Sequence, residues 1–178
     1  FPVTYERFGT AMVTIDGTKL EFVTARKESY AEDSRKPNVE PATYEEDAAR
    51  RDFTCNALLK GLHDGAVRDP LGSGVADLRG GVLRTPLDPV ATFRDDPLRT
   101  MRAVRFRFRL GFRYADGLEE AIRQESGRLA IVSVERWRDE LLKILAGPRP
   151  GEALGELADL GLLDVHFPEW RAMKGVEQ

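Results

Sequence analysis

The sequence predicts an α+β protein in which antiparallel strands come first and an all-helical region follows. Residues 3–26 alternate apolar and polar positions and are rich in Val, Thr, Ile and Phe, which is typical of strands. Residues 93–113 repeat apolar residues at three- and four-residue steps, which is typical of a helix. After residue 115, further segments show the same spacing between capping residues and glycine.

The composition is that of an ordinary globular protein. A chain of 178 residues with 42% apolar residues can form one good-sized domain or two small ones. The net charge is only -3, so any surface for nucleic acid must be a local patch. No apolar run approaches the length of a membrane span and no signal peptide is recognisable, so we expect no membrane association.

Cys55 is the only cysteine, which excludes a disulfide within the chain and fits a reducing compartment. We therefore expect a cytoplasmic protein. Phe53, Ala57 and Leu58 surround this cysteine in sequence, which favours a buried thiol over a nucleophile.

The first 26 residues predict a β-hairpin, with strands over 3–15 and 19–26 joined at Asp16-Gly17. Alternation places Glu21 and Val23 on one face of the second strand. Glu21 is either a half-exposed glutamate of an edge strand or a metal-binding carboxylate. Residues 27–42 are highly charged and contain two prolines, which predicts a mobile surface loop.

A short helix through Arg50 is expected next, because Thr43 and Glu46 form a capping box. Arg50, Arg51 and Asp52 then form a charge cluster directly before an apolar segment. Arginine can bind phosphate with its planar fork, and aspartate can accept from ribose hydroxyls. The alternative is a helix end with Asp52 as the cap of the next helix.

Residues 67–69 predict a short strand, and the segment that follows is dense in glycine. Over 69–85 this density predicts tight turns and a hinge in place of a packed element. Its spacing fits neither the P-loop nor the dinucleotide-binding fingerprint. We therefore divide the chain into 1–68, a hinge-like linker over 69–92, and 93–178.

The stretch 93–113 is expected to be helical from Asp96-Pro97 onward, with Asp96 as the N-cap and Pro97 in the first position. The run 105–110 also alternates like a strand, but the capped start and the long stripe favour a helix. The apolar stripe consists of Leu98, Met101, Val104, Phe108 and Phe112. Seven arginines against two aspartates give this stretch a local excess of +5, which suits a polyanion such as nucleotide phosphate or an RNA backbone.

Asp96 and Arg99 stand three residues apart and would be neighbours on one helical face. A carboxylate beside a guanidinium can read the Watson–Crick edge of cytosine or adenine, because both bases donate an exocyclic amino group and accept at a ring nitrogen. Uracil and guanine would instead set a carbonyl oxygen against the carboxylate. The alternative is that Asp96 caps the helix and forms a solvated ion pair with Arg99.

Three helices are expected beyond this stretch: 115–125 ending near Gly127, 134–146 capped by Ser133, and 150–160 ended by Gly161. The second should turn Trp137, Leu141, Leu142 and Leu145 inward. No chemistry is identifiable on these helices from sequence.

RRDFTCNAL at 50–58, DPLGSGVADL at 69–78 and DDPLRTMRAVRF at 95–106 occur in series. Together they resemble the class II tRNA nucleotidyltransferases (CCA-adding enzymes) and the similar bacterial poly(A) polymerases. The resemblance implies a partial nucleotidyltransferase head of the polymerase-beta type followed by a helical neck. It implies addition of CMP and AMP from CTP and ATP to the 3′ end of tRNA, with Mg²⁺. The alternatives are an A-adding enzyme or poly(A) polymerase, or a non-catalytic RNA-binding fragment.

The same resemblance implies roles for individual residues. Glu21 stands at the position of a catalytic, metal-binding carboxylate, and 133–146 resembles a supporting helix of the neck. DPLGSGVADL resembles the flexible link between head and neck. Asp95 departs from the family, which usually has glutamate there. The nucleotide-binding residues expected are Arg51, Asp52, Asn56, Asp96, Arg99, Arg102 and Arg105.

One element of the family pattern is not found in this sequence. The Asp-x-Asp that holds the catalytic metal ions precedes the matching region, and transfer with two metal ions needs more carboxylates than Glu21. This polypeptide alone is therefore expected to bind nucleotide weakly and to catalyse nothing. The sequence makes no prediction of oligomeric state.

Overall fold

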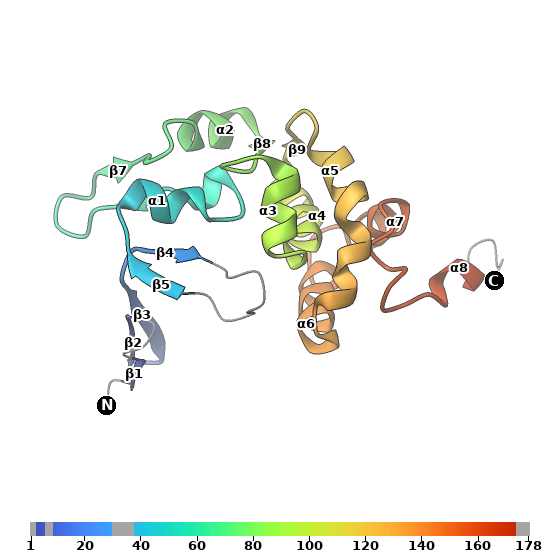
Figure 1. Ribbon diagram of the computed structural model, residues 1–178, viewed down its shortest axis with the longest axis horizontal. Helices are drawn as coiled ribbons and strands as arrows, with labels where there is room; N and C mark the ends of the chain where they lie inside the picture. The colour runs from blue at the N-terminus through green and yellow to red at the C-terminus, as the bar shows by residue number, and fades with distance from the viewer. Residues whose placement is uncertain (1–2, 6–8, 30–37, 174–178) are drawn as a thin grey trace. The chain divides into compact units, whose positions relative to one another are not determined.

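A computed structural model describes residues 3–5, 9–29 and 38–173 (Figure 1). The chain forms two compact units, Phe1–Arg50 and Arg51–Gln178. Strands predominate in the first and helices in the second, which confirms the α+β prediction. Among the described residues, no helix combines the length and the apolar character needed to cross a membrane.

The first unit contains an antiparallel sheet in the order β1-β2-β3, from β1 (Val3–Tyr5), β2 (Thr10–Ile15) and β3 (Thr18–Val23). Asp16 and Gly17 both have positive φ, 49° and 76°, as a tight two-residue hairpin turn requires. The hairpin prediction is confirmed. A single strand over 3–15 was wrong, because β1 and β2 are separate strands paired with each other.

A second antiparallel pair, β4 (Arg26–Ser29) and β5 (Asn38–Pro41), follows in the same unit. The prediction of a loop over 27–42 was therefore wrong at both ends, and 30–37 lie outside the described residues. Charge and proline do not prevent backbone pairing in a two-stranded ribbon. Helix α1 (Tyr44–Ala49) begins at the predicted capping box: Glu46 N donates to Thr43 Oγ1, and Thr43 N donates to Glu46 Oε2.

The second unit begins with short elements: the 3₁₀ turn η2 (Thr54–Asn56), β6 (Leu59–Lys60), β7 (Val67–Arg68), helix α2 (Gly74–Gly80) and β8 (Val82–Leu83). The prediction that 69–85 holds no packed element was wrong, whereas its role as a hinge stays a prediction. Thr54 Oγ1 donates to Asp77 Oδ2 over 2.8 Å, and both residues are buried. A Cβ on Gly74 would lie 2.7 Å from the carbonyl oxygen of Thr54, so this glycine serves close packing.

The predicted helix forms from the expected start, and a second helix that was not predicted precedes it. Helix α3 (Pro89–Asp95) ends where Asp96 adopts an extended conformation, and α4 (Leu98–Leu110) begins after Pro97. Proline disfavours helical conformation in the residue before it, which explains the break. The predicted apolar stripe is confirmed, because Leu98, Met101, Val104 and Phe108 are buried and Phe112 packs against the same core.

The remaining elements are β9 (Arg113–Tyr114), α5 (Leu118–Glu125), the 3₁₀ segment η3 (Ser126–Ile131), α6 (Val134–Leu145), α7 (Pro150–Asp159) and α8 (Trp170–Met173). Strand β9 pairs in parallel with β8, so this half is not entirely helical as predicted. The predicted cap is present, since Arg136 N donates to Ser133 Oγ.

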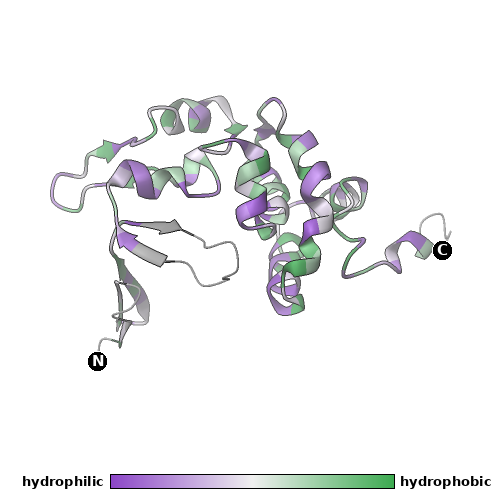
Figure 2. Ribbon diagram, viewed as in Figure 1, coloured by the Kyte–Doolittle hydropathy of each residue, from purple (hydrophilic) through white to green (hydrophobic). Residues whose placement is uncertain are grey.

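Helices α3 to α7 surround one apolar core, which also includes Phe53 and Leu83 from the first third of this unit. Figure 2 shows hydrophilic and hydrophobic residues side by side along these helices, as amphipathic packing requires. Trp137 and Leu141 face the core, but Leu142 and Leu145 are 56% and 40% exposed, so their predicted inward orientation was wrong. Ile144 and Glu140 take those inward places. The division of the chain into three domains stays a prediction.

Candidate functional site

Asp52 is the second residue of the second unit and the carboxylate of the charged loop, residues 51–53 before η2. Its side chain is buried, and its Oδ1 accepts from Phe53 N at 2.9 Å and from Asn56 Nδ2 at 3.1 Å. Its Oδ2 accepts from Arg102 of α4, whose Nε lies 2.8 Å away. Because a carboxylate has about four acceptor positions, these contacts fill the capacity of Asp52.

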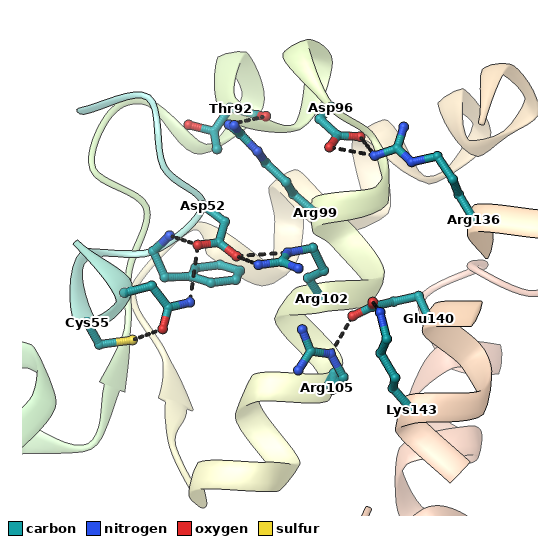
Figure 3. A network of polar contacts seen from close by, with 12 residues as sticks. Asp52, Cys55, Thr92, Asp96, Arg99, Arg102, Arg105, Arg136, Glu140 and Lys143 are labelled. Atoms are coloured by element: carbon teal, nitrogen blue, oxygen red, sulfur yellow. Dashed lines mark hydrogen bonds and ion pairs between the residues drawn. The ribbon is translucent and has the colours of Figure 1, made fainter. Parts of the chain in front are cut away.

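Arg102 thus joins two segments that are 50 residues apart in sequence (Figure 3). Its guanidinium also lies 5.4 Å from the centroid of the Phe106 ring, and that ring packs edge-on against Phe53 at 5.7 Å. The charged loop is therefore fixed to α4 by an ion pair and an aromatic contact together.

Cys55 lies beside this cluster and is partly buried, where the sequence predicted a buried thiol. Burial raises the pKa of its thiol to about 11, and the negative charge of Asp52 adds to the shift. A thiol with that pKa is protonated at neutral pH, so it is not an activated nucleophile.

Asp96 lies at the junction of α3 and α4 and is held from two sides. Its Oδ1 accepts from Leu98 N at 3.3 Å, so it partly fulfils the predicted capping role. Arg136 of α6 places its Nη2 3.1 Å from Oδ2 and 3.4 Å from Oδ1 of the same carboxylate. Among the described contacts of Asp96, one acceptor position on Oδ2 is left open.

Arg99 stands one turn before Arg102, and Figure 3 shows both side chains leaving the same side of α4. Arg99 is half-buried, and its Nη1 donates to the carbonyl oxygen of Thr92 at 3.4 Å. The expected helical relation between Asp96 and Arg99 is not formed, because Asp96 has φ -142° and ψ 98°. The two groups flank the start of α4 and have different partners in this conformation.

Arg105 continues the row, but only 10% of its side chain is exposed. Its Nε pairs with Oε1 of Glu140 on α6, and Lys143 Nζ lies 3.4 Å from the other oxygen of that carboxylate. The side chain of Glu140 is 2% exposed, so the two cations neutralise a buried charge. Arg105 thereby fixes α4 to α6.

The positive charge of 93–113 is largely neutralised within the protein, which the local sequence count does not reveal. Arg94 pairs with Glu125 of α5, and Arg107 pairs with Glu156 of α7. Glu156 also accepts from the buried Tyr114 hydroxyl at 2.5 Å. Burial raises the pKa of Glu156 despite opposing contributions from Tyr114 and Arg107, and burial raises the pKa of Tyr114 as well.

The other two predicted site residues are exposed. Arg51 opens the second unit, and Glu21 lies on β3 of the first unit, opposite Met12. In the part of the chain that the structure describes, no three His, Cys, Asp or Glu side chains gather as metal ligands would. Glu21 and its described neighbours therefore do not by themselves fit a metal site, and no chemical step through a metal follows from them.

Sequence reasoning missed Arg136 and Glu140, which hold Asp96 and Arg105. Both lie on the helix to which no chemistry was assigned. Glu140 carried a detectable signal, because it stands on the inward stripe with Trp137, Leu141 and Ile144, where a carboxylate needs a buried cation. Arg136 carried no such signal, since an exposed arginine in the first turn of a helix has many ordinary explanations.

The fold and this cluster define a protein with part of a nucleotidyltransferase head and a helical neck. The family model for the poly A polymerase head domain matches residues 2–84, and the model described as the probable RNA and SrmB-binding site of polymerase A matches 111–174. The chain belongs to this family, which contains the CCA-adding enzymes.

Individual relatives agree with this assignment. A CCA-adding enzyme of Geobacillus thermodenitrificans is 43% identical over 169 residues, which cover 91% of this chain and 41% of that protein. The solved CCA-adding enzyme of Bacillus stearothermophilus in complex with CTP has a TM-score of 0.78 at 36% identity, covering 91% of this chain and 39% of the other. The Thermotoga maritima CCA-adding enzyme complexed with tRNA_CCA has a TM-score of 0.78 at 29% identity, covering 95% and 38%.

The chain spans 28%, 30% and 41% of the lengths of three curated relatives. What those proteins do as a whole is therefore a property of more polypeptide than this chain contains.

Proposed function

We propose that this chain is the nucleotide-selecting part of a tRNA nucleotidyltransferase that adds CMP and AMP, from CTP and ATP, to the 3′ end of tRNA without a nucleic-acid template. In this reaction the 3′ hydroxyl of the RNA attacks the α-phosphate of the nucleotide, and pyrophosphate leaves. The proposal draws on the family, on the relatives that act as CCA-adding enzymes, and on the geometry at the start of α4.

The observation that carries the proposal is the difference between the two aspartates. Asp52 has its acceptor positions filled by Phe53, Asn56 and Arg102, whereas Asp96 keeps one open position on Oδ2. A carboxylate that is oriented by Arg136 and still has room for one donor suits the exocyclic amino group of cytosine or adenine.

Arg99 supplies the matching donors. Its guanidinium, which donates to the carbonyl oxygen of Thr92 at 3.4 Å, carries five N–H donors in a planar fork that suits the acceptors of a base. Cytosine would accept at O2 and N3, and adenine at N1. Uracil and guanine would place a carbonyl oxygen against Asp96. Both groups are acceptors, so each would lose its hydrogen bonds to water without gaining a donor, which weakens binding.

Asp52 and Arg102 then act mainly as positioning residues. Their ion pair fixes Asp52 to α4, so that Arg51 and Asn56, which we expect to bind the nucleotide, stay in register with the base-selecting pair. Arg105 contributes in the same way through Glu140. Glu21 would be one of several carboxylates needed to hold Mg²⁺, because alone it does not fit a metal site. A cytoplasmic location stays a prediction from the cysteine content.

The test is nucleotide selection by the full-length protein on tRNA that lacks its 3′ residues. Arg99→Ala should lose about 1–3 kcal/mol of discrimination for C over U, which is the size of one good bidentate base contact. Arg99→Lys keeps the charge but loses the fork, so it should resemble Arg99→Ala. Arg113→Ala, an exposed arginine on β9, is the matched control.

Unchanged discrimination in Arg99→Ala would remove the base-selecting role. The family model named after poly A polymerase favours a second candidate, an A-adding enzyme or poly(A) polymerase. The two are separated by whether tRNA lacking all three 3′ residues is extended with CTP. A non-catalytic RNA-binding protein would extend no tRNA with either nucleotide.

A further inference from the structure

We propose that a basic pocket at the end of α4 binds a phosphate group of the RNA backbone. The basic pocket is a cavity of about 420 Å³ between the ends of α4 and α6 and the turn before α7. Its polar lining consists of Arg105, Arg109, Lys143 and Arg149. The inference rests on the proposed function, because it assigns a place to the RNA that receives the nucleotides.

The pocket keeps a positive charge after its internal ion pairs are counted. Arg105 and Lys143 share the single carboxylate of Glu140, and Arg149 lies 3.6 Å from Glu152. Four cations against these two carboxylates leave +2. Arg109 is exposed at the rim and can reach a ligand directly. Lys143 is 59% exposed, and when it turns to a ligand the buried Glu140 keeps Arg105 as its partner.

The surroundings of the aromatic ring in the pocket favour a phosphate over a base as the ligand. Phe108 is the aromatic residue of the pocket, and its ring is flanked by the guanidinium groups of Arg107 and Arg149 at 5.1 Å and 5.0 Å from the centroid. With these groups against it, the ring offers little face for a base to stack on. Beside its apolar lining, the pocket presents the nitrogen donors of four cationic side chains, which suit phosphate oxygens.

Helix C-termini carry partial negative charge, and two of them border this pocket. At α6 this effect is reduced, because Ala146 N donates to the carbonyl of Leu142 and Gly147 N donates to that of Ile144, each at 3.0 Å. Helix α7 begins at Pro150, directly after the pocket residue Arg149, so the positive end of its helix dipole lies beside the pocket. The charged side chains therefore decide the sign of the local field.

The pocket also lies in line with the proposed base-selecting residues. Arg99, Arg102, Arg105 and Arg109 follow one another along α4 at steps of three, three and four residues. Ten residues of helix separate the first from the last, which is about 15 Å. An RNA whose 3′ end is presented at Arg99 can therefore place an upstream backbone phosphate at the basic pocket.

The experiment measures binding of tRNA lacking its 3′ CCA to the full-length protein by fluorescence anisotropy between 0.05 and ~0.5 M salt, a range in which counterion release dominates. The variant is Arg109→Ala combined with Lys143→Ala. Loss of one phosphate contact should reduce the magnitude of the slope of log K against log salt by about 0.7–0.9. If variant and wild type bind equally at 1 M salt, a slope difference of about 0.8 makes the variant roughly sixfold weaker at 0.1 M salt. The matched control is Arg79→Ala combined with Arg138→Ala, two exposed cations that do not line the pocket.

Affinity for CTP is measured in the same variants and distinguishes the two sources of phosphate. The inference expects weaker RNA binding and unchanged CTP binding. Because Lys143 also faces the buried Glu140, the single variant Arg109→Ala, which should keep the melting temperature of the wild type, must show part of the same loss. Weaker CTP binding with unchanged RNA binding would make the pocket a triphosphate site and overturn the RNA assignment. If the wild type binds tRNA and the variant binds it equally well, the pocket assignment alone is overturned. If the wild type does not bind tRNA, the proposed function is overturned as well.

Discussion

The ion pair between Asp52 and Arg102 makes the sharpest prediction about stability. Replacing Arg102 by alanine leaves a buried carboxylate, 8% exposed, with its donors from Phe53 and Asn56 but without a cation. Removing one partner of a buried pair costs about 3–5 kcal/mol. Because the Arg102 side chain is 33% exposed, water can partly replace it, and we expect a loss of about 2 kcal/mol.

Both tryptophans, Trp137 and Trp170, belong to the second unit, so their fluorescence reports the unfolding of the part that contains the pair. A loss of about 2 kcal/mol should lower the melting temperature of this unit by roughly 6 °C. Arg79→Ala, an exposed arginine on α2, should change the free energy of unfolding by no more than about 0.5 kcal/mol.

A double-mutant cycle with Asp52→Ala separates the pair from other effects. If the two side chains act on each other, the double variant should be more stable than the sum of the single losses predicts, by about 1–3 kcal/mol. Losses that add within about 0.5 kcal/mol would refute the argument that this pair fixes the charged loop to α4.

Three further predictions concern other groups. Arg136→Ala should lower discrimination for C over U by about 1.4- to 5-fold, since an exposed pair to Asp96 contributes roughly 0.2–1 kcal/mol. Arg136→Lys should restore part of it, and equal discrimination in the wild type and both variants would contradict a positioning role. Cys55 should react with iodoacetamide at pH 8 about 100-fold more slowly than an ordinary thiol, because its pKa is about 11 in place of 9.0; a rate like that of glutathione would show that the thiol is not held in this environment. Glu156 has a raised pKa in the folded state, so its ionisation opposes folding. The free energy of unfolding of the wild type relative to Glu156→Gln should therefore fall as pH rises above 4.5, which urea unfolding at several pH values would measure. A relative stability that rises with pH would contradict this sign.

Local rules predicted the elements whose signals lie within a few residues. The turn at Asp16-Gly17, the capping box of Thr43 and Glu46, and the cap at Ser133 all formed as expected, because backbone conformation and nearby hydrogen bonds decide them. The apolar stripe of α4 was likewise visible from its spacing. The glycine-dense segment 69–85 was misjudged because glycine at 74 permits close approach of Thr54, and a sequence does not distinguish that use from a hinge.

Sequence alone thus determined the family motifs, the choice of helix over strand for residues 98–110, and which residue types are available for phosphate and base recognition. Only the tertiary structure decided which of those charges remain available. Glu125, Glu140 and Glu156, each distant in sequence, neutralise arginines that a local count leaves free. The physical reason is that burying a charge requires a partner, and the fold, through contacts 30 to 50 residues apart, chooses that partner.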